Sequence, residues 1–370
     1  MRIALATYST RPRGGVVHTL SLAEALVDQG HEVAVWTLAR GGDAAFFRPV
    51  DPRVEVRAVP FPEREGEGVG PRILRSIATL AEAFAPEGAD VVHAQDCISA
   101  NALPGCIRTV HHLDAFTTPE LAACHERALV EPRAHVCVSA AVAAELAEGW
   151  GLAATVIPNG VDADRFARAA SGDAAAAAAR RRWRDQLPGS PLVLAVGGIE
   201  PRKGTVDLLE AVAHLRHRHP AAQLVVAGGE TLFDHREYRH AFEARRVDLD
   251  VPVAVLGPVA HDALPSLVAA ADVFCFPSTK EGFGLAAMEA LAAGVPLVTR
   301  DLPVLREVFG AAARVGVDPP SLAAALDEAL SDPDPARRRA GEALAASCSW
   351  PAAARAHVAL YRRLQADGTL

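Results

Sequence analysis

The feature that most constrains the fold is a regular alternation of short apolar segments with longer amphipathic ones along the whole chain. The short segments have the length and β-branched composition of buried strands, and the longer ones have the periodicity of helices. Strands are expected at residues 3–7, 32–37, 91–94, 108–112, 136–139 and 155–157, and again at 192–196, 224–227, 253–256, 273–277 and 297–299. The alternation predicts βαβ units and parallel sheets, and therefore an α/β protein.

The alternation falls into two similar halves, each with a glycine pair after its first strand, Gly14-Gly15 and Gly197-Gly198. A length of 370 residues suits two domains. We expect an N-terminal domain over 1–165, a C-terminal domain over 190–349, and a linker over 166–189, where an alanine run and an arginine-rich run interrupt the pattern. The linker is expected to merge into the first helix of the second domain, with the basic run as a solvated helix face and not a binding patch. Residues 350–370 predict a helix that crosses back to pack on the N-terminal domain, although capping of the C-terminal domain is the alternative.

Charge and composition exclude several classes of function. The net charge is −8, and residues 1–165 contain no lysine and more acidic than basic residues, which disfavours nucleic acid and anionic membranes as partners. No apolar run is long enough for a membrane-spanning helix, and the first one is too short for a signal peptide. The six cysteines form no C-x-x-C pair, as expected for a reducing compartment. A cytoplasmic protein is expected.

Lysine is nearly absent from this chain, and its two occurrences are Lys203 and Lys280. Both lie in glycine-rich, turn-like segments of the kind that cradle phosphate. In a chain that otherwise uses arginine, lysine is expected where a compact, mobile ammonium is needed. Survival by chance is the alternative, and it is the stronger interpretation for Lys280.

The segment Glu281-Gly-Phe-Gly-Leu-Ala-Ala-Met-Glu289 follows a predicted strand and opens a predicted helix. The first backbone N–H groups of that helix, at Phe283, Gly284 and Leu285, predict an anion site, because a helix start has no internal acceptors for them. Glu289 is placed to bind ribose hydroxyls and Glu281 to accept from sugar hydroxyls. A helix cap followed by a solvated glutamate is the structural alternative.

These motifs resemble the family 4 retaining glycosyltransferases of the GT-B fold. The pattern from Pro277 to Pro296 is similar to that family's signature, with two glutamates eight positions apart. Further similar segments cover nearly the whole chain in order: the glycine pair and Gly30-His-Glu-Val33, Ile157-Pro-Asn-Gly-Val-Asp162, Gly197–Gly204, Leu256-Gly-Pro258 and Ala271-Asp-Val-Phe274. The resemblance implies two Rossmann-like parallel-sheet domains that face a cleft.

The resemblance also implies roles for donor-binding residues. A nucleotide-diphosphate sugar would bind mainly to the C-terminal domain, with Lys203 and the backbone amides of Phe283, Gly284 and Leu285 on its diphosphate. Glu289 would hold the ribose, Glu281 would position the donor sugar, the base would lie near Gly257, and Gly15 would let the N-terminal loop approach the diphosphate. A lysine with helix-end amides can stabilise a leaving diphosphate, so neither a metal ion nor a separate cofactor is expected.

At two positions this sequence departs from the family pattern or leaves its match open. The family usually has arginine at the position of Gly198, and Arg202 is the natural substitute because it keeps two cations at the turn. The family also ends the strand near Val110 with a histidine at the acceptor side; the alignment favours His111, with His112 as the runner-up. Asp114 is a further acceptor-side candidate, or a loop cap.

The resulting hypothesis is a metal-independent, retaining, hexosyltransferase-type enzyme. It would move a sugar to a hydroxyl of a small-molecule or saccharide acceptor, with His111, Lys203 and Glu281 as its catalytic residues. The alternatives are a non-hydrolysing nucleotide-sugar epimerase of the same fold and a catalytically silent sugar-binding subunit. A dinucleotide-dependent oxidoreductase is disfavoured, because the first glycine turn lacks the G-x-G-x-x-G fingerprint.

Overall fold

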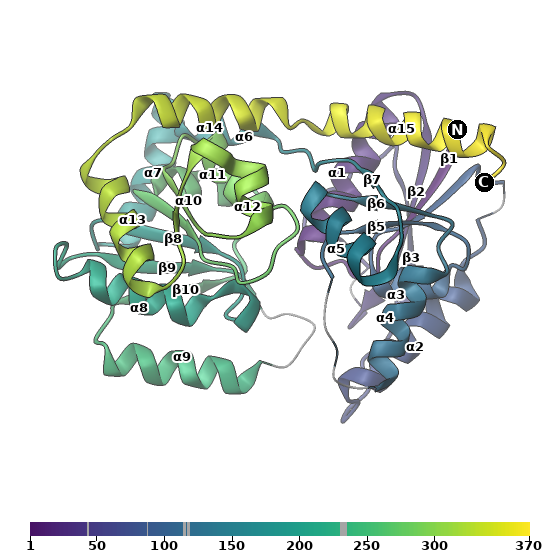
Figure 1. The fold of residues 1–370 in the computed structure, drawn as a ribbon, viewed down its shortest axis with the longest axis horizontal. Coiled ribbons are helices and arrows are strands. Elements are labelled where there is room, and N and C mark those ends of the chain that lie inside the picture. Colours follow the sequence, from purple (N-terminus) through teal and green to yellow (C-terminus); the bar gives the residue numbers. More distant parts are fainter. Residues whose placement is uncertain (43, 87, 114–115, 117–118, 230–234) are drawn as a thin grey trace. The chain divides into compact units, whose positions relative to one another are not determined.

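The protein is described from a computed structural model of residues 1–42, 44–86, 88–113, 116, 119–229 and 235–370. The chain forms two compact units (Figure 1). Unit 1 comprises Met1–Gly160 together with Trp350–Leu370, and unit 2 comprises Val161–Ser349. Each unit is a parallel sheet covered by helices, so the predicted α/β class with two Rossmann-like domains is confirmed.

The sheet of unit 1 has seven strands in the order β3-β2-β1-β4-β5-β6-β7, all parallel. Its strands are β1 (Arg2–Ala6), β2 (Glu32–Arg40), β3 (Glu55–Phe61), β4 (Val91–Ala94), β5 (Ile107–Val110), β6 (Ala134–Cys137) and β7 (Thr155–Val156). Since β1 pairs with both β2 and β4, the winding of the chain reverses there, and ligands of such sheets bind at this switch point, beyond the carboxyl ends of the strands.

Helices cover both faces of the sheet in unit 1, as buried parallel strands require. They are α1 (Gly14–Asp28), α2 (Val69–Ala83), α3 (Cys97–Ala102), α4 (Pro119–Val130), α5 (Ala140–Trp150) and α15 (Trp350–Ala366). The last of these, α15, packs against α1 (Figure 1). The predicted return of the C-terminal helix to the N-terminal domain is therefore confirmed.

Helix α15 is fixed by apolar side chains at helical spacing and by buried histidines. Ala354, Val358 and Tyr361 lie on its buried face. The Tyr361 hydroxyl is 2.7 Å from His93 Nδ1 on β4, and His357 Nδ1 donates to its own helix, at 2.8 Å from the Ala353 carbonyl. Burial lowers the pKa of His93 well below its usual range and that of His357 to about 4, so both rings are neutral near pH 7.

The sheet of unit 2 has six strands in the order β10-β9-β8-β11-β12-β13, again all parallel. They are β8 (Leu192–Val196), β9 (Gln223–Ala227), β10 (Val253–Gly257), β11 (Val273–Phe276), β12 (Leu297–Arg300) and β13 (Ala313–Gly316). Here β8 pairs with both β9 and β11, which makes the end of β8 the switch point.

Unit 2 contains nine α-helices and two 3₁₀ turns within its described residues. They are α6 (Ala163–Ala170), α7 (Ala174–Gln186), η1 (Pro201–Lys203), α8 (Thr205–Leu215), α9 (Arg236–Asp248), α10 (Leu264–Ala270), α11 (Leu285–Ala292), α12 (Pro303–Phe309), η2 (Gly310–Ala312), α13 (Pro319–Ser331) and α14 (Pro335–Ser347). Among the parts of the chain that the structure describes, no helix has the length and apolar character needed to cross a membrane.

Residues 166–189, for which the sequence predicts a linker, instead form most of α6 and all of α7 inside unit 2. Tertiary contacts explain the difference. Trp183 donates from Nε1 to Ser266 Oγ at 3.0 Å, and Arg184 pairs with Asp272 at 2.6 Å. The arginine-rich run therefore anchors a helix to the body of unit 2.

Candidate functional site

The donor-side residues predicted from the sequence gather at the carboxyl edge of the unit 2 sheet. The loop after β8 carries Gly197 and leads into η1, and the loop after β11 leads into α11. A small hollow between the two loops is lined by Gly197, Gly198, Lys203, Phe276 and Ser278, among others. This is the switch point of the sheet, where a ligand is expected.

An ion pair between Lys203 and Glu281 joins these two loops. Lys203 Nζ donates to Glu281 Oε1, and the same oxygen is 3.0 Å from Arg202 Nη1 and 3.4 Å from Ser278 Oγ. The side chains are mostly removed from water, with exposures of 18% for Lys203 and 10% for Glu281. At this depth the attraction between opposite charges exceeds that of a surface pair.

A second carboxylate, Glu200, completes the cluster and was missed by the sequence analysis. Glu200 is 8% exposed and accepts from Arg202 Nη2 at 3.3 Å, while His235 Nε2 lies 3.9 Å from its other oxygen. The guanidinium of Arg202 is thus held between Glu200 and Glu281. The sequence feature that could have indicated Glu200 is its position within the glycine loop, directly before Pro201.

The loops approach so closely that their backbones admit only glycine at two positions. A Cβ on Gly228 would lie 2.3 Å from the Gly197 carbonyl carbon, and one on Gly204 would lie 2.3 Å from the Pro277 oxygen. Gly204 also has a φ of +62°, in the left-handed region. The aliphatic part of Lys203 packs on Gly197, and its ammonium lies 5.0 Å from the centre of the Phe276 ring.

The start of α11 has the geometry predicted for an anion site. Gly284 is its N-cap with a φ of +95°, and a Cβ there would lie 3.0 Å from Phe309 and 3.1 Å from Phe276. Phe283 is buried, so its side chain anchors the turn. Because the cap offers no side-chain acceptor, the N–H groups of the first turn, beginning with Leu285, remain for a ligand.

Glu289 lies one turn further along α11, partly buried beside the start of α6. Burial raises the pKa of its carboxyl to about 7, with the charge of Arg165 lowering it and that of Asp162 raising it. Asp162 caps α6 by accepting from the Arg165 N–H at 3.2 Å. Glu289 was predicted from the sequence, but its two charged neighbours on α6 were not.

The end of β10, where the sequence places the nucleotide base, is an irregular turn. Gly257 has a φ of +65°, and the register with β9 shifts there. A Cβ on Gly229, in the loop after β9, would lie 2.9 Å from Pro258 Cγ. The loop after β9 therefore lies against both the loop after β8 and the loop after β10.

At the carboxyl edge of unit 1, the structure brings Gly15 and His111 together. A Cβ on Gly15 would lie 3.6 Å from His111 Nε2 and 3.8 Å from the Gln95 carbonyl oxygen. His111 is hydrogen-bonded to the Gln95 backbone, and burial lowers its pKa to about 3. Its Nε2 is buried and has no partner among the described residues, so Nδ1–H is the donor to Gln95 and Nε2 is a free acceptor beside Gly15.

The neighbours of His111 are positioned differently. His18 is fully buried, with Nδ1 2.8 Å from Asn159 Oδ1 and its ring edge-to-face with His111 at 4.9 Å between centroids. His112 is half-buried, and its charge also lowers the pKa of His111. Asp114 lies outside the described residues.

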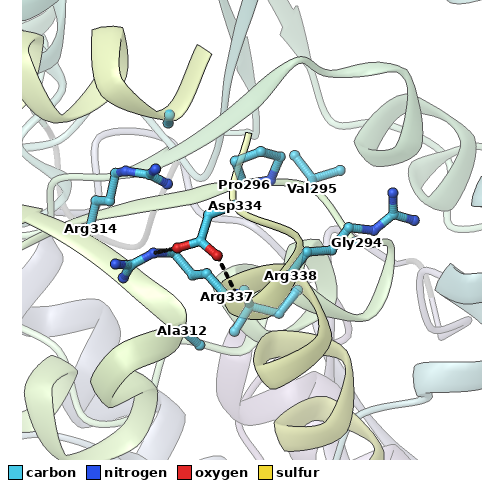
Figure 2. Close-up of a pocket in the computed structure, with 10 residues that line it drawn as sticks. Gly294, Val295, Pro296, Ala312, Arg314, Asp334, Arg337 and Arg338 are labelled. Carbon is cyan, nitrogen blue, oxygen red and sulfur yellow. Dashed lines mark hydrogen bonds and ion pairs between the residues drawn. The ribbon is translucent and has the colours of Figure 1, made fainter. Parts of the chain in front are cut away.

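A separate hollow in unit 2 is lined by three arginines and lies between β13, α11 and α14 (Figure 2). Arg337 donates to the carbonyls of Ala311 and Ala313 at 2.7 and 2.9 Å. Arg314 donates to the Asp332 carbonyl at 3.0 Å, and Arg338 to Glu342 at 2.8 Å. These arginines hold structural elements together, and the hollow includes none of the predicted site residues.

Comparison with known proteins decides the family. Residues 12–165 match the model described as Glycosyltransferase Family 4, and residues 179–345 match that of Glycosyl transferases group 1. The chain is 30% identical to a phosphatidyl-myo-inositol mannosyltransferase of Mycobacterium tuberculosis, over 100% of this chain and 98% of that protein. The chain belongs to the family 4 glycosyltransferases. The resemblance seen in the sequence is confirmed, and the epimerase and the silent subunit lose their support.

Other relatives agree with this glycosyltransferase assignment. A D-inositol 3-phosphate glycosyltransferase of Salinispora tropica is 31% identical over 94% of this chain and 82% of that protein. Among solved structures, sucrose-phosphate synthase from Thermosynechococcus elongatus has a TM-score of 0.79 at 21% identity and covers 99% of both chains. The HepE protein of Anabaena has a TM-score of 0.75 at 18% identity over 98% of this chain and 100% of that one. The GT-B fold is thereby confirmed.

The contact between Gly228 and Gly197 gives a prediction about stability. Gly228→Ala forces the loop after β9 away from the loop after β8, which we expect to lower the free energy of unfolding by roughly 1–3 kcal/mol, as overpacking does. Urea denaturation measures it. Gly172→Ala is the matched control in unit 2, because a Cβ there meets no atom within 4 Å. Equal stability of the two variants would contradict the close approach.

Proposed function

We propose that this glycosyltransferase moves a sugar from a nucleotide-diphosphate sugar to a hydroxyl acceptor with retention of configuration and without a metal ion. The observation that carries the proposal is the Lys203–Glu281 ion pair beside the glycine turn that opens α11. A fixed cation and outward N–H groups at one sheet edge suit a leaving diphosphate, and a carboxylate between them suits the hydroxyls of the donor sugar.

The donor proposal assigns one part of the nucleotide sugar to each part of the unit 2 edge. Lys203, Arg202 and the α11 amides hold the diphosphate, Glu289 accepts from the ribose hydroxyls, and the base lies against the turn at Gly257. A related fold supports this assignment, since the HepE protein of Anabaena was solved with UDP-glucose. Two cations at the phosphate turn provide the charge that a metal ion supplies elsewhere.

In the proposed mechanism the acceptor hydroxyl attacks the anomeric carbon on the face that the diphosphate leaves. The bond from that carbon to the phosphate oxygen breaks, the bond to the acceptor oxygen forms, and the hydroxyl proton passes to the departing phosphate oxygen. Lys203 stabilises the charge on that oxygen. His111 is neutral and keeps Nε2 as an acceptor that no described residue uses, so its proposed part is to orient a sugar hydroxyl.

The acceptor is proposed to be a small molecule or a saccharide, with the reaction taking place in the cytoplasm. Relatives named for an inositol phosphate and a sucrose phosphate support small polyhydroxylated substrates.

Charge stabilisation at the donor phosphate predicts that Lys203→Ala and Glu281→Gln each reduce turnover by about 100-fold or more. The measurement is release of nucleoside diphosphate in the presence of a panel of acceptors. Lys280→Ala is the matched control, because it removes the other lysine of the chain one position before Glu281 and should remain close to wild type. Turnover in Lys203→Ala equal to that of the Lys280→Ala control would contradict the proposed mechanism.

Gly15 yields a prediction that separates folding from catalysis. In Gly15→Ala the new methyl group lies in ordinary contact with His111, at 3.6 Å, so thermal stability should be kept or increased by the better helix propensity. The same methyl covers Nε2, and turnover should fall by about tenfold or more. Gly14→Ala, whose Cβ meets nothing within 4 Å, is the control and should retain activity. Equal turnover in both variants would remove the acceptor-side role of this contact.

The raised pKa of Glu289 predicts a pH-dependent affinity for the donor. Its carboxyl has a pKa of about 7, so it becomes ionised, and a better acceptor for ribose hydroxyls, as the pH rises through that value. The affinity for UDP-glucose, which does not titrate in this range, should increase up to about tenfold between about pH 6 and about pH 8. Isothermal titration calorimetry measures this change. A pH dependence that persists in Glu289→Gln would assign it to another group.

A further inference from the structure

Unit 1 holds a second group of charges that the proposed chemistry does not use. Two arginines flank Tyr8, which follows β1: Arg13 precedes α1 and Arg40 ends β2. Arg72 of α2 lies near Arg40. We call these three arginines the arginine cluster. They come from three segments that are far apart in sequence, and each is half-buried.

Arg40 is held rigidly at the centre of the cluster. Its Nη2 donates to Ser76 Oγ at 2.9 Å, and its Nε donates to the Tyr8 carbonyl at 3.3 Å. The bond to Ser76 ties β2 to α2, and Ser76 in turn donates to the Arg72 carbonyl of its own helix at 2.7 Å. The guanidinium lies over the rings of Tyr8 and Phe61, at 5.1 and 5.2 Å from their centres. Its orientation is therefore set before any ligand binds.

Arg13 has spare capacity for hydrogen bonding. One terminal nitrogen donates to the Tyr8 hydroxyl, and the guanidinium lies 5.4 Å from the centre of that ring. Its Nε is buried and has no partner among the described residues. A buried N–H of a charged group without an acceptor is uncommon, and a bound anion is one of its ordinary explanations.

Among the described residues, the acid beside Arg40 is already engaged by other groups. Asp96 is the acid whose charge favours ionised Arg40, but its oxygens already accept from the backbone N–H groups of Tyr8 and Ser99, at 2.9 and 2.8 Å. Glu67, just before α2, is held by Arg75 in two bonds of 2.7 and 2.6 Å, and the charge of Arg72 also acts on it. Burial, together with the charges of Arg72 and Arg13, lowers the pKa of Arg40 to about 10.

The cluster lies at the same carboxyl edge as His111. Arg13 is the N-cap of α1, and Gly15, in the first turn of that helix, packs against His111. Asp96 directly follows Gln95, whose carbonyl orients the His111 ring. A compact molecule held by the cluster would therefore present its hydroxyls toward the acceptor-side histidine.

We propose that the arginine cluster binds the phosphate of a phosphorylated acceptor, so that the transferred sugar is added to a hydroxyl of a sugar phosphate or polyol phosphate. The proposal rests on the proposed function and names the substrate class of its acceptor side. Guanidinium groups match phosphate oxygens in bidentate geometry. A phosphomonoester, with its second negative charge, attracts the guanidinium groups of Arg13 and Arg40 more strongly than the phosphodiester of a membrane lipid does.

The test measures binding of inorganic phosphate at constant ionic strength by calorimetry, in a Lys203→Ala background that removes the donor-side cation. We expect Arg13→Gln and Arg40→Gln each to weaken phosphate binding by about tenfold or more, as loss of a charge-assisted hydrogen bond does. Arg53→Gln is the matched control, since Arg53 is an exposed arginine of the same unit and is paired with Asp28 and Asp51. Phosphate affinity in the two cluster variants equal to that of the control would overturn the proposal.

UDP binding and vesicle flotation distinguish loss of the phosphate site from misfolding, from failure of the donor site and from binding to a lipid. UDP binding, measured in the Arg13→Gln and Arg40→Gln variants without the Lys203 change, reports whether each variant remains folded. UDP binding by the wild-type protein tests the proposed function by itself, so phosphate binding without UDP binding would support the cluster and count against the donor site. Flotation with phosphatidylglycerol vesicles tests the lipid source, and cluster-dependent flotation without phosphate binding would contradict a soluble acceptor.

Discussion

The ion pair between Lys203 and Glu281 is the interaction on which the unit 2 site depends. It ties the loop after β8 to the loop after β11; Gly204 lets these backbones meet, and Gly197 leaves room for the Lys203 side chain. Removing either charge would leave the other largely out of water without its partner, apart from Arg202 beside Glu281. In the proposed reaction the donor diphosphate would replace Glu281 as part of the ammonium's pairing. Until the diphosphate binds, the ion pair holds the Lys203 ammonium in position.

The fold followed from the sequence where strands are buried on both faces, because such strands are continuous apolar runs. The strand β8 has the bounds that the sequence predicts, and α15 was recognised by its apolar spacing. By contrast, β3 (Glu55–Phe61) was missed because it pairs only with β2 and carries charged, exposed residues. Residues 166–189 were predicted as a linker merging into a helix, whereas they form most of α6 and all of α7. The alanine and arginine runs of α7 carry no apolar stripe, and its position is set by contacts such as Arg184 with Asp272.

The site was predictable to the extent that its residues lie within single motifs. Gly284 and Glu289 could be identified from the local requirements of a helix start. Lys203 could be identified because lysine is rare in this chain and this one lies in a glycine loop. The neighbours of these residues were not predictable, because the fold supplies them from elsewhere: Arg165 reaches Glu289 from α6, and Arg40 reaches Tyr8 from a different strand. Such pairings across segments determine protonation and charge balance, which a single sequence does not reveal.

The distribution of basic residues now has a physical explanation. Where a charge is buried among aromatic rings and must keep a fixed orientation, as at Arg40, a planar guanidinium serves because it stacks and stays charged. In the proposed reaction a charge must follow a phosphate oxygen as a bond breaks, and a compact ammonium on a flexible stem, such as that of Lys203 over Phe276, is better suited to this. If unit 1 only orients an acceptor phosphate while unit 2 accommodates developing charge, arginine at the first site and lysine at the second follow from the chemistry. Lys280 contributes its backbone carbonyl to Arg202, and the structure gives its ammonium no comparable task.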